Sequence, residues 1–307
     1  MISTNFIDNI GSKLSDPQFS SFLAPSFIFW FGGLLAYINK YGITSLELFL
    51  NQYSEISKII FLIFAFILIT LSAFLVKSFD LSLLRLLEGY WPIYMQSLKK
   101  ILIARKRKLI SHAEHHWQQL AVKKELSNLT RDEHELYIRL DQNLRQYPTD
   151  PMMLMPTKLG NILRSHESQT LSRFGLDANV CWPRLWLLLP EKVKFELQSA
   201  RSDLYISTRL FFWSCIFSFW GIWLWWAFPL SIISVFICYQ SILKNASIFG
   251  CLCESTFDLY RRSLYDSLGW SLPTNLSNEH ESGLKLSEFF WRGTLPILSN
   301  MMPEGLD

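Results

Sequence analysis

Three closely spaced histidines are the residues whose types and spacing most directly suggest chemistry. They form the pattern H-x-x-H-H at His112, His115 and His116, within KKILIARKRKLISHAEHH, residues 99–116. In a helix, His112 and His116 lie one turn apart and could share a metal ion. The other histidines are isolated and no third ligand is apparent, whereas the di-iron sites of membrane desaturases need several histidine boxes. We therefore predict surface histidines, with no metal and no cofactor.

The basic run Arg105–Lys108 just before these histidines raises the question of nucleic-acid binding. Consecutive helical residues point about 100° apart, so four in a row surround the helix instead of forming one face. The formal net charge of +3 is also small, and no aromatic-interleaved motif accompanies the run. We predict a solvated helix surface and no nucleic acid. Contact with lipid headgroups stays open as an alternative, which requires the chain to fold back to a membrane surface at Pro92.

A second set of polar residues could form a site in the stretch Pro156–Val193, where turn residues, aromatic residues and charges are densely mixed. An apolar run there holds Arg184 in its middle. Because a charge in apolar surroundings is usually paired, we expect a buried pair between Arg184 and either Glu167 or Asp177. The full candidate cluster, functional or structural, is Glu88, Arg164, Glu167, Arg173, Asp177, Arg184, Asp258 and Arg261.

No motif of a common catalytic site is present. The sequence has no G-x-S-x-G, no H-E-x-x-H, no P-loop and no Gly-rich dinucleotide fingerprint. Its five cysteines are scattered, and the C-x-C at Cys251 and Cys253 lacks the spacing of a zinc half-site. We predict no catalytic residue. A lipid-modifying or hydrolytic enzyme that uses residues 156–190 stays open as an alternative.

The composition and four apolar runs indicate a membrane protein. Half of the residues are apolar and 18% are charged, against about 25% in a typical soluble domain. A helix needs roughly 20 apolar residues to cross a bilayer, and four runs approach or reach that length. They are Phe22–Ile38, Ile59–Val76, Leu210–Phe228 and Pro229–Leu243.

The third and fourth runs meet at Pro229, which can begin a helix but cannot continue one. We therefore predict a tight hairpin with one helix on either side of this proline. Trp220, Trp223, Trp225 and Trp226 gather near its tip. An interfacial aromatic belt explains them, and packing or a ligand face is the alternative.

The orientation of the spans follows from the Lys and Arg near their ends, because cytoplasmic segments carry an excess of them. Ten lie on one side: Lys13, Lys77, Arg85, Lys192, Lys194, Arg201, Arg209, Lys244, Arg261 and Arg262. The other side has Lys40 and Lys58. We predict a multi-pass protein of the bacterial inner membrane with both termini in the cytoplasm.

The predicted fold class is all-α, with four transmembrane helices in two hairpins and a helical cytosolic domain between them. The predicted segments are a cytosolic N-terminal segment (1–21), a first transmembrane hairpin (22–76), the helical cytosolic domain (77–207), a second transmembrane hairpin (208–245) and a cytosolic C-terminal segment (246–307).

Local signals organise the predicted cytosolic domain. Gly89 and Pro92 are expected to break the chain. Thr130–Glu133 reads TRDE and predicts a capping box at the start of a helix. Asp258 with Arg261 or Arg262, three or four residues later, fits an ion pair on a helix surface. A heptad-like stripe suited to packing on another helix recurs at spacings of 4, 7, 4 and 7: Leu98, Leu102, Leu109, Ala113 and Leu120.

Four blocks of the sequence resemble an uncharacterised family of bacterial multi-spanning membrane proteins. The blocks are LRLLEGYWP (84–92), PTKLGNILRSHE (156–167), RFGLDANVCWPRLWLLLP (173–190) and FDLYRRSLYDSLGW (257–270). They keep their order around a pair of spans and cover residues 84–273. The resemblance implies a bacterial inner-membrane protein. It implies no activity, because the family has none to carry over.

Three hypotheses for the function follow, the third being the enzyme named above. The first is a non-enzymatic scaffold, sensor or effector whose cytosolic helical domain binds a protein partner or assembles into a homo-oligomer. The second is an oligomeric channel gated from the cytosol, with Ser231, Ser234 and Ser241 facing the pore because spacings of 3 and 7 place them on one helical face. Helix packing through small residues is the alternative for these serines. The expected partners are the lipid bilayer and a protein.

Overall fold

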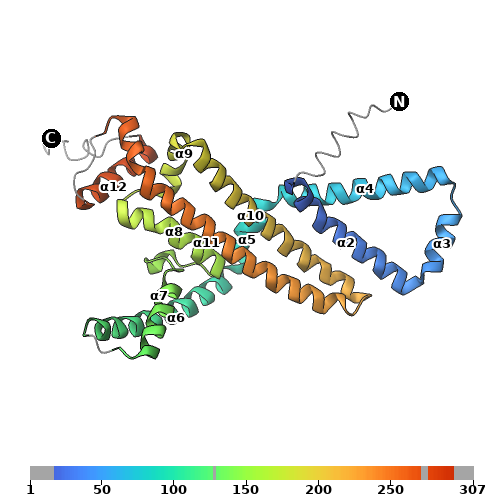
Figure 1. Ribbon diagram of the computed structural model, residues 1–307, viewed down its shortest axis with the longest axis horizontal. Helices are drawn as coiled ribbons and strands as arrows, with labels where there is room; N and C mark the ends of the chain where they lie inside the picture. Colours follow the sequence, from blue (N-terminus) through green and yellow to red (C-terminus); the bar gives the residue numbers. More distant parts are fainter. Residues whose placement is uncertain (1–16, 127–128, 271–275, 294–307) are drawn as a thin grey trace, which may run out of the picture. The chain divides into compact units, whose positions relative to one another are not determined.

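The computed structural model describes residues 17–126, 129–270 and 276–293 (Figure 1). Helix accounts for 87% of the structure, and the described residues contain no strand. The all-α prediction is confirmed. The elements in chain order are α2 (Pro17–Tyr41), α3 (Ile43–Asn51), α4 (Glu55–Ser78), α5 (Asp80–Glu88), η1 (Ile93–Met95), α6 (Gln96–Glu125), α7 (Arg131–Leu144), η2 (Pro151–Met153), α8 (Lys158–Phe174), α9 (Ala178–Leu188), α10 (Glu191–Phe217), η3 (Ser218–Ile222), α11 (Ala227–Leu268) and α12 (Leu276–Arg292).

The chain divides into two compact units. The first comprises residues 1–85 and 202–245, and the second comprises residues 86–201 and 246–307. The boundaries at 201/202 and 245/246 lie inside α10 and α11, so each of these long helices contributes to both units. The predicted hairpins 22–76 and 208–245 both fall in the first unit, which therefore holds the predicted membrane part.

Two helices among the described residues, α4 and α11, are long and apolar enough to cross a membrane. The apolar window of α4 is 11% buried and that of α11 is 22% buried, whereas a helix in the core of a soluble protein is mostly covered. Ile59, Leu62 and Phe64 point to different sides of α4 and are all exposed. An uncovered helix that is apolar all round favours lipid as its surroundings. α2 and α10 do not meet the same criterion, so four transmembrane helices are not confirmed.

The third apolar run does not form the single helix that we expected from Leu210 to Phe228. α10 ends at Phe217, the short 3-10 helix η3 follows, and α11 begins at Ala227. Pro229 lies in the first turn of α11. The N–H groups of a first turn have no partner within the helix, so a proline costs no hydrogen bond there. The start of a helix near this proline was expected. The end of α10 at Phe217, ten residues before the start of α11, was not.

The end of α10 coincides with close packing on two glycines of α2. A Cβ at Gly32 would lie 2.6 Å from Cε2 of Phe217, and a Cβ at Gly33 would lie 2.5 Å from Cζ2 of Trp220. Because only glycine allows side chains to approach a backbone so closely, the two rings lie directly against α2.

The four tryptophans at the hairpin tip divide between packing and exposure. Trp220 and Trp223 have ring centroids 6.1 Å apart, and the carbonyl of Trp223 accepts a hydrogen bond from Asn39 Nδ2 at 3.1 Å. Trp225 and Trp226 are exposed. The packing alternative therefore describes the first pair, while the second pair has the exposure that an interfacial belt requires.

The core of the second unit is built by α8, α9 and α12 together with parts of α10 and α11. Its buried residues are Phe174, Leu176, Cys181, Leu185, Leu189, Leu197, Phe257, Leu264, Tyr265 and Leu286. Gly175, with φ 69°, ends α8 in the left-handed region. Gly283 of α12 lies so close to the carbonyl of Phe174 that a Cβ there would collide with it. α12 can therefore pack directly on the end of α8.

α6 and α7 form a helical hairpin in the second unit, side by side in Figure 1. The break before α6 is confirmed, with Gly89 at φ 102° and Pro92 before η1. The capping box at Thr130 and Glu133 is also confirmed. The Trp117 ring stacks on Tyr137 with centroids 5.7 Å apart.

The predicted stripe on α6 is covered at three of its five positions, Leu102, Ala113 and Leu120. Leu120 is buried, but Leu98 is 45% exposed and Leu109 is 71% exposed. The covered side of α6 also runs through Ile103, Ile110 and Trp117, which are seven residues apart. It therefore keeps a heptad-like spacing and includes only part of the predicted stripe.

We predict that replacing Asn161 with alanine destabilises the second unit by about 2–3 kcal/mol, because buried polar groups lose their partners. The side chain is fully buried. Its Oδ1 accepts from the Met155 N–H at 2.9 Å, and its Nδ2 donates to the carbonyls of Met155 at 2.8 Å and Thr157 at 2.6 Å. Thermal unfolding followed by circular dichroism measures the loss. Asn143→Ala, at an exposed position of α7, is the control, and equal effects of the two changes would contradict the prediction.

Candidate functional site

The predicted polar residues are divided among separate networks. One network joins α8 to α11. His166 Nδ1 lies 2.8 Å from Glu254 Oε2, and Arg173 Nη1 lies 3.0 Å from Glu254 Oε1 and 3.8 Å from Asp258 Oδ2. Gly250 leaves room for the His166 ring, because a Cβ at this position would collide with it. Glu254 is the centre of this network and was missed from the sequence. Its spacing of four residues from Asp258 was the available signal.

A second network links α8 to α9 and to the segment after α5. Arg164 donates to Glu167 Oε2 at 3.1 Å and to the hydroxyl of Tyr90 at 2.9 Å. Asn179 Nδ2 donates to the other carboxylate oxygen of Glu167. Glu88 takes part through its backbone carbonyl, which accepts from Thr157 Oγ1 at 2.7 Å. The network therefore ties the end of α5 to the start of α8.

The expected buried pair of Arg184 with Glu167 or Asp177 is wrong. Arg184 is exposed, donates to the Val180 carbonyl at 2.7 Å, and lies over the Phe290 ring at 4.3 Å. Asp177 caps α9 by accepting from the backbone N–H of Asn179 at 2.9 Å. Because Glu167 and Asp177 already have partners, Arg184 stacks on an aromatic ring instead.

The ion pair expected between Asp258 and Arg261 is replaced by contacts with other helices. Arg261 Nε lies 2.6 Å from Glu279 Oε1 of α12, and its guanidinium lies 4.0 Å from the centre of the Phe174 ring. Arg261 meets Asp258 only at the backbone carbonyl. The carboxylate of Asp258 turns toward Arg173. These charged residues therefore connect α8, α11 and α12 and do not pair on the surface of one helix.

The described residues contain no group of three or more His, Cys, Asp or Glu placed to hold a metal ion. His112 and His116 stack with ring centroids 6.2 Å apart on α6. Burial raises the pKa of the Cys181 thiol to about 11 and that of Cys253 to about 12. Both thiols are therefore protonated near neutral pH, which makes them poor nucleophiles. The polar networks described above consist of hydrogen bonds and ion pairs that connect helices of the second unit.

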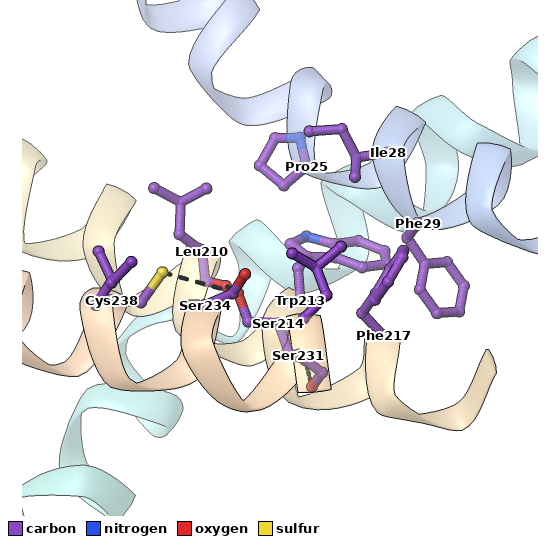
Figure 2. A pocket seen from close by; sticks show the side chains of 12 residues that line it. Pro25, Ile28, Phe29, Leu210, Trp213, Ser214, Phe217, Ser231, Ser234 and Cys238 are labelled. Atoms are coloured by element: carbon purple, nitrogen blue, oxygen red, sulfur yellow. Dashed lines mark hydrogen bonds between the residues drawn. The ribbon is translucent and has the colours of Figure 1, made fainter. Parts of the chain in front are cut away.

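The first unit contains an apolar pocket between α2, α10 and α11, with a cavity volume of about 290 Å³ (Figure 2). An engineered apolar cavity of about 150 Å³ is large enough for benzene, so this pocket admits a larger apolar group. It is lined by Pro25, Ile28, Phe29, Leu210, Trp213, Ser214, Phe217, Leu230, Ser231, Ser234, Ile237 and Cys238.

Two of the three serines predicted to face a pore line this pocket instead of the outer surface of α11. Ser231 is buried and donates to the carbonyl of Ser214 at 2.7 Å. Ser234 lies on the pocket wall (Figure 2). Ser241 lies outside the pocket, with its Oγ 3.3 Å from that of Ser207 on α10. Within one chain these contacts match the packing alternative, and the pore stays a prediction.

A buried ion pair in the first unit was not expected from the sequence. Arg209 Nε lies 2.9 Å from Asp80 Oδ1, and the two side chains are 10% and 15% exposed. Burial raises the pKa of Asp80, although Arg209 and Lys77 oppose the rise. Arg209 directly precedes the third apolar run and Asp80 closely follows the second. That placement at two span ends was the only available signal.

Comparison with known proteins found no matching family model, no matching curated protein and no matching solved structure.

We predict that Arg209→Leu destabilises the protein by about 3–5 kcal/mol, because it leaves a buried carboxylate without its partner. The double change Arg209→Leu with Asp80→Asn should cost less, and Arg85→Gln at an exposed position is the control. A raised pKa means that the folded protein binds the Asp80 proton more tightly than the unfolded chain does. The deficit of Arg209→Leu should therefore shrink as the pH falls. Thermal unfolding at several pH values tests this, and a deficit that grows on acidification would contradict it.

Proposed function

We propose that this chain is a non-enzymatic protein of the bacterial inner membrane, and that its helical second unit acts in the cytoplasm. In this proposal α2, α4, α10 and α11 form two transmembrane hairpins, and both termini are cytoplasmic. The exposed apolar surface of α4 supports insertion. The distribution of Lys and Arg supports the orientation. The resemblance to bacterial multi-spanning membrane proteins agrees with insertion in an inner membrane.

Of the roles of scaffold, sensor and effector, the geometry favours a sensor. The observation that carries this proposal is the continuity of α11. This helix contributes Ser231 and Ser234 to the pocket of the first unit and Phe257 and Tyr265 to the core of the second unit. A helix resists bending because its backbone hydrogen bonds run along it. A change at one part of α11 can therefore reach the other.

α10 also runs through both units and is a second helical connection between them. Its residue Trp213 lines the pocket, and its residue Leu197 lies in the core of the second unit. In our proposal an apolar ligand enters the pocket and shifts α10 against α11. The shift alters the packing of the second unit and thereby the surface that a protein partner meets. Such a coupling requires that the ligand bind one arrangement of the helices better than the other.

The orientation predicts which positions an impermeant reagent reaches. Gln52→Cys, between α3 and α4, should react in intact cells with a maleimide that does not cross the membrane, whereas Asn143→Cys on α7 should react only after permeabilisation. Both positions are exposed. Wild-type protein, with its five native cysteines, sets the background. The reverse pattern would contradict the proposed orientation.

The coupling predicts that filling the pocket changes the second unit. Ser234→Phe places a ring in the pocket, whereas Ile233→Phe places the same ring at an outer position that is already 57% exposed. We expect faster amide hydrogen exchange in α8, α9 and α12 for Ser234→Phe and no change for Ile233→Phe. Mass spectrometry of both variants measures the exchange. Identical exchange in the second unit of the two variants would count against a sensor.

A further inference from the structure

The first half of α6 and the turn before it carry large apolar side chains that no described part of the chain covers. Ile93 is 86% exposed, Tyr94 83%, Ile101 52% and Leu109 71%. Such a group of exposed apolar residues marks an interaction surface. It belongs to the second unit and is separate from the pocket described above.

These side chains lie along one side of the helix. At about 100° per residue, Tyr94, Leu98, Ile101 and Leu109 fall within roughly 80° of one another, and Arg105 lies among them. The side that meets α7, through Ile110 and Trp117, is about 130° away. α6 therefore has two separate apolar sides. One apolar side packs in the hairpin and the other is left without a partner among the described residues.

The charge of this segment selects the partner. Between Gly89 and Ala113 there are six Lys and Arg and no Asp or Glu. A second copy of the same segment would bring like charges together, which opposes self-association. An anionic lipid surface offers both hydrocarbon for the apolar side chains and negative charge for the basic ones. Apolar residues on one side of a helix with Lys and Arg around them are typical of helices that lie in a membrane interface.

The position in the chain agrees with this partner. α4, the most apolar helix, ends at Ser78, and α6 begins at Gln96 after the breaks at Gly89 and Pro92. A basic cluster close behind a membrane span on the cytoplasmic side is the pattern that binds anionic lipids. Because Gly89 and Pro92 interrupt the helix, no straight helix has to carry these charges away from the surface.

We propose that residues 93–109 lie on the cytoplasmic surface of the membrane and bind anionic phospholipids. Tyr94, Leu98, Ile101 and Leu109 enter the interface, while Lys100, Lys108 and their basic neighbours meet the phosphate groups. This inference rests on the proposed membrane insertion. It adds an anionic lipid surface as a partner of the second unit, which makes the response of that unit dependent on the lipid composition.

The experiment uses the full chain in vesicles of phosphatidylcholine alone or mixed equally with phosphatidylglycerol. A bimane fluorophore on Ile101→Cys reports burial by a blue shift and by quenching from a spin-labelled lipid. We expect both effects in the anionic vesicles, and their loss in high salt, because the Debye length falls to about 3 Å at 1 M. The same label on Asn143→Cys of α7 is the control for a solvated position.

A pair of charge variants separates lipid binding from net charge. Each lysine near an anionic surface contributes a factor of about five, so Lys100→Gln with Lys108→Gln should lower the docked population on the order of twentyfold. Arg131→Gln with Arg139→Gln removes the same charge from exposed positions of α7 and should change nothing. Equal effects of the two pairs would overturn the proposal. So would a blue shift that follows protein density instead of lipid charge, which would indicate self-association.

A label on Leu62→Cys of α4 distinguishes the failure of this inference from the failure of the proposed function. Leu62 is 72% exposed in the middle of the most apolar helix. Quenching at Leu62 with no lipid dependence at Ile101 overturns the docking of α6 alone. Quenching at Ile101 with none at Leu62 supports the docking and overturns membrane insertion.

Discussion

The pairing of α10 with α11 is the contact on which the first unit depends, because these two helices form two of the three walls of its pocket. Small polar side chains hold the pair together along its length. Ser231 donates to the Ser214 carbonyl at 2.7 Å, and Asn245 Nδ2 donates to Ser207 Oγ at 2.7 Å. Small residues let helices approach closely, and hydrogen bonds between them are retained where water is scarce. The same pairing therefore satisfies the polar groups and shapes the apolar space beside them.

The features that could be predicted from the sequence are the local ones. The capping box at Thr130, the break at Gly89 and Pro92, and the apolar α4 each depend on a few neighbouring residues or on composition. The all-α class follows from the same kind of signal. The stripe of α6 was only partly right, because Leu98 and Leu109 are exposed and the covered side depends on how α7 packs as well as on the sequence of α6.

The choice of partner for a charged residue could not be predicted, because it depends on helices that meet only in the folded chain. Arg261 pairs with Glu279, 18 residues away, and Glu254 receives His166 and Arg173 from α8. In each case a residue within helical reach was the simpler expectation. Arg184 shows the converse, since the carboxylates that it was expected to meet were already hydrogen-bonded and it remained exposed.

The hairpin tip determines how the first unit can meet a membrane. Between Phe217 and Ala227 the chain is not α-helical, and lipid cannot satisfy the backbone groups of such a segment. Some of these groups find partners within the tip. The N–H groups of Trp223 and Leu224 bond to the Trp220 carbonyl at 3.0 and 2.8 Å. The ring of Trp220 lies against Gly33 of α2. A non-helical tip that is hydrogen-bonded internally and packed on a neighbouring helix is compatible with membrane depth, where an unpartnered loop would not be.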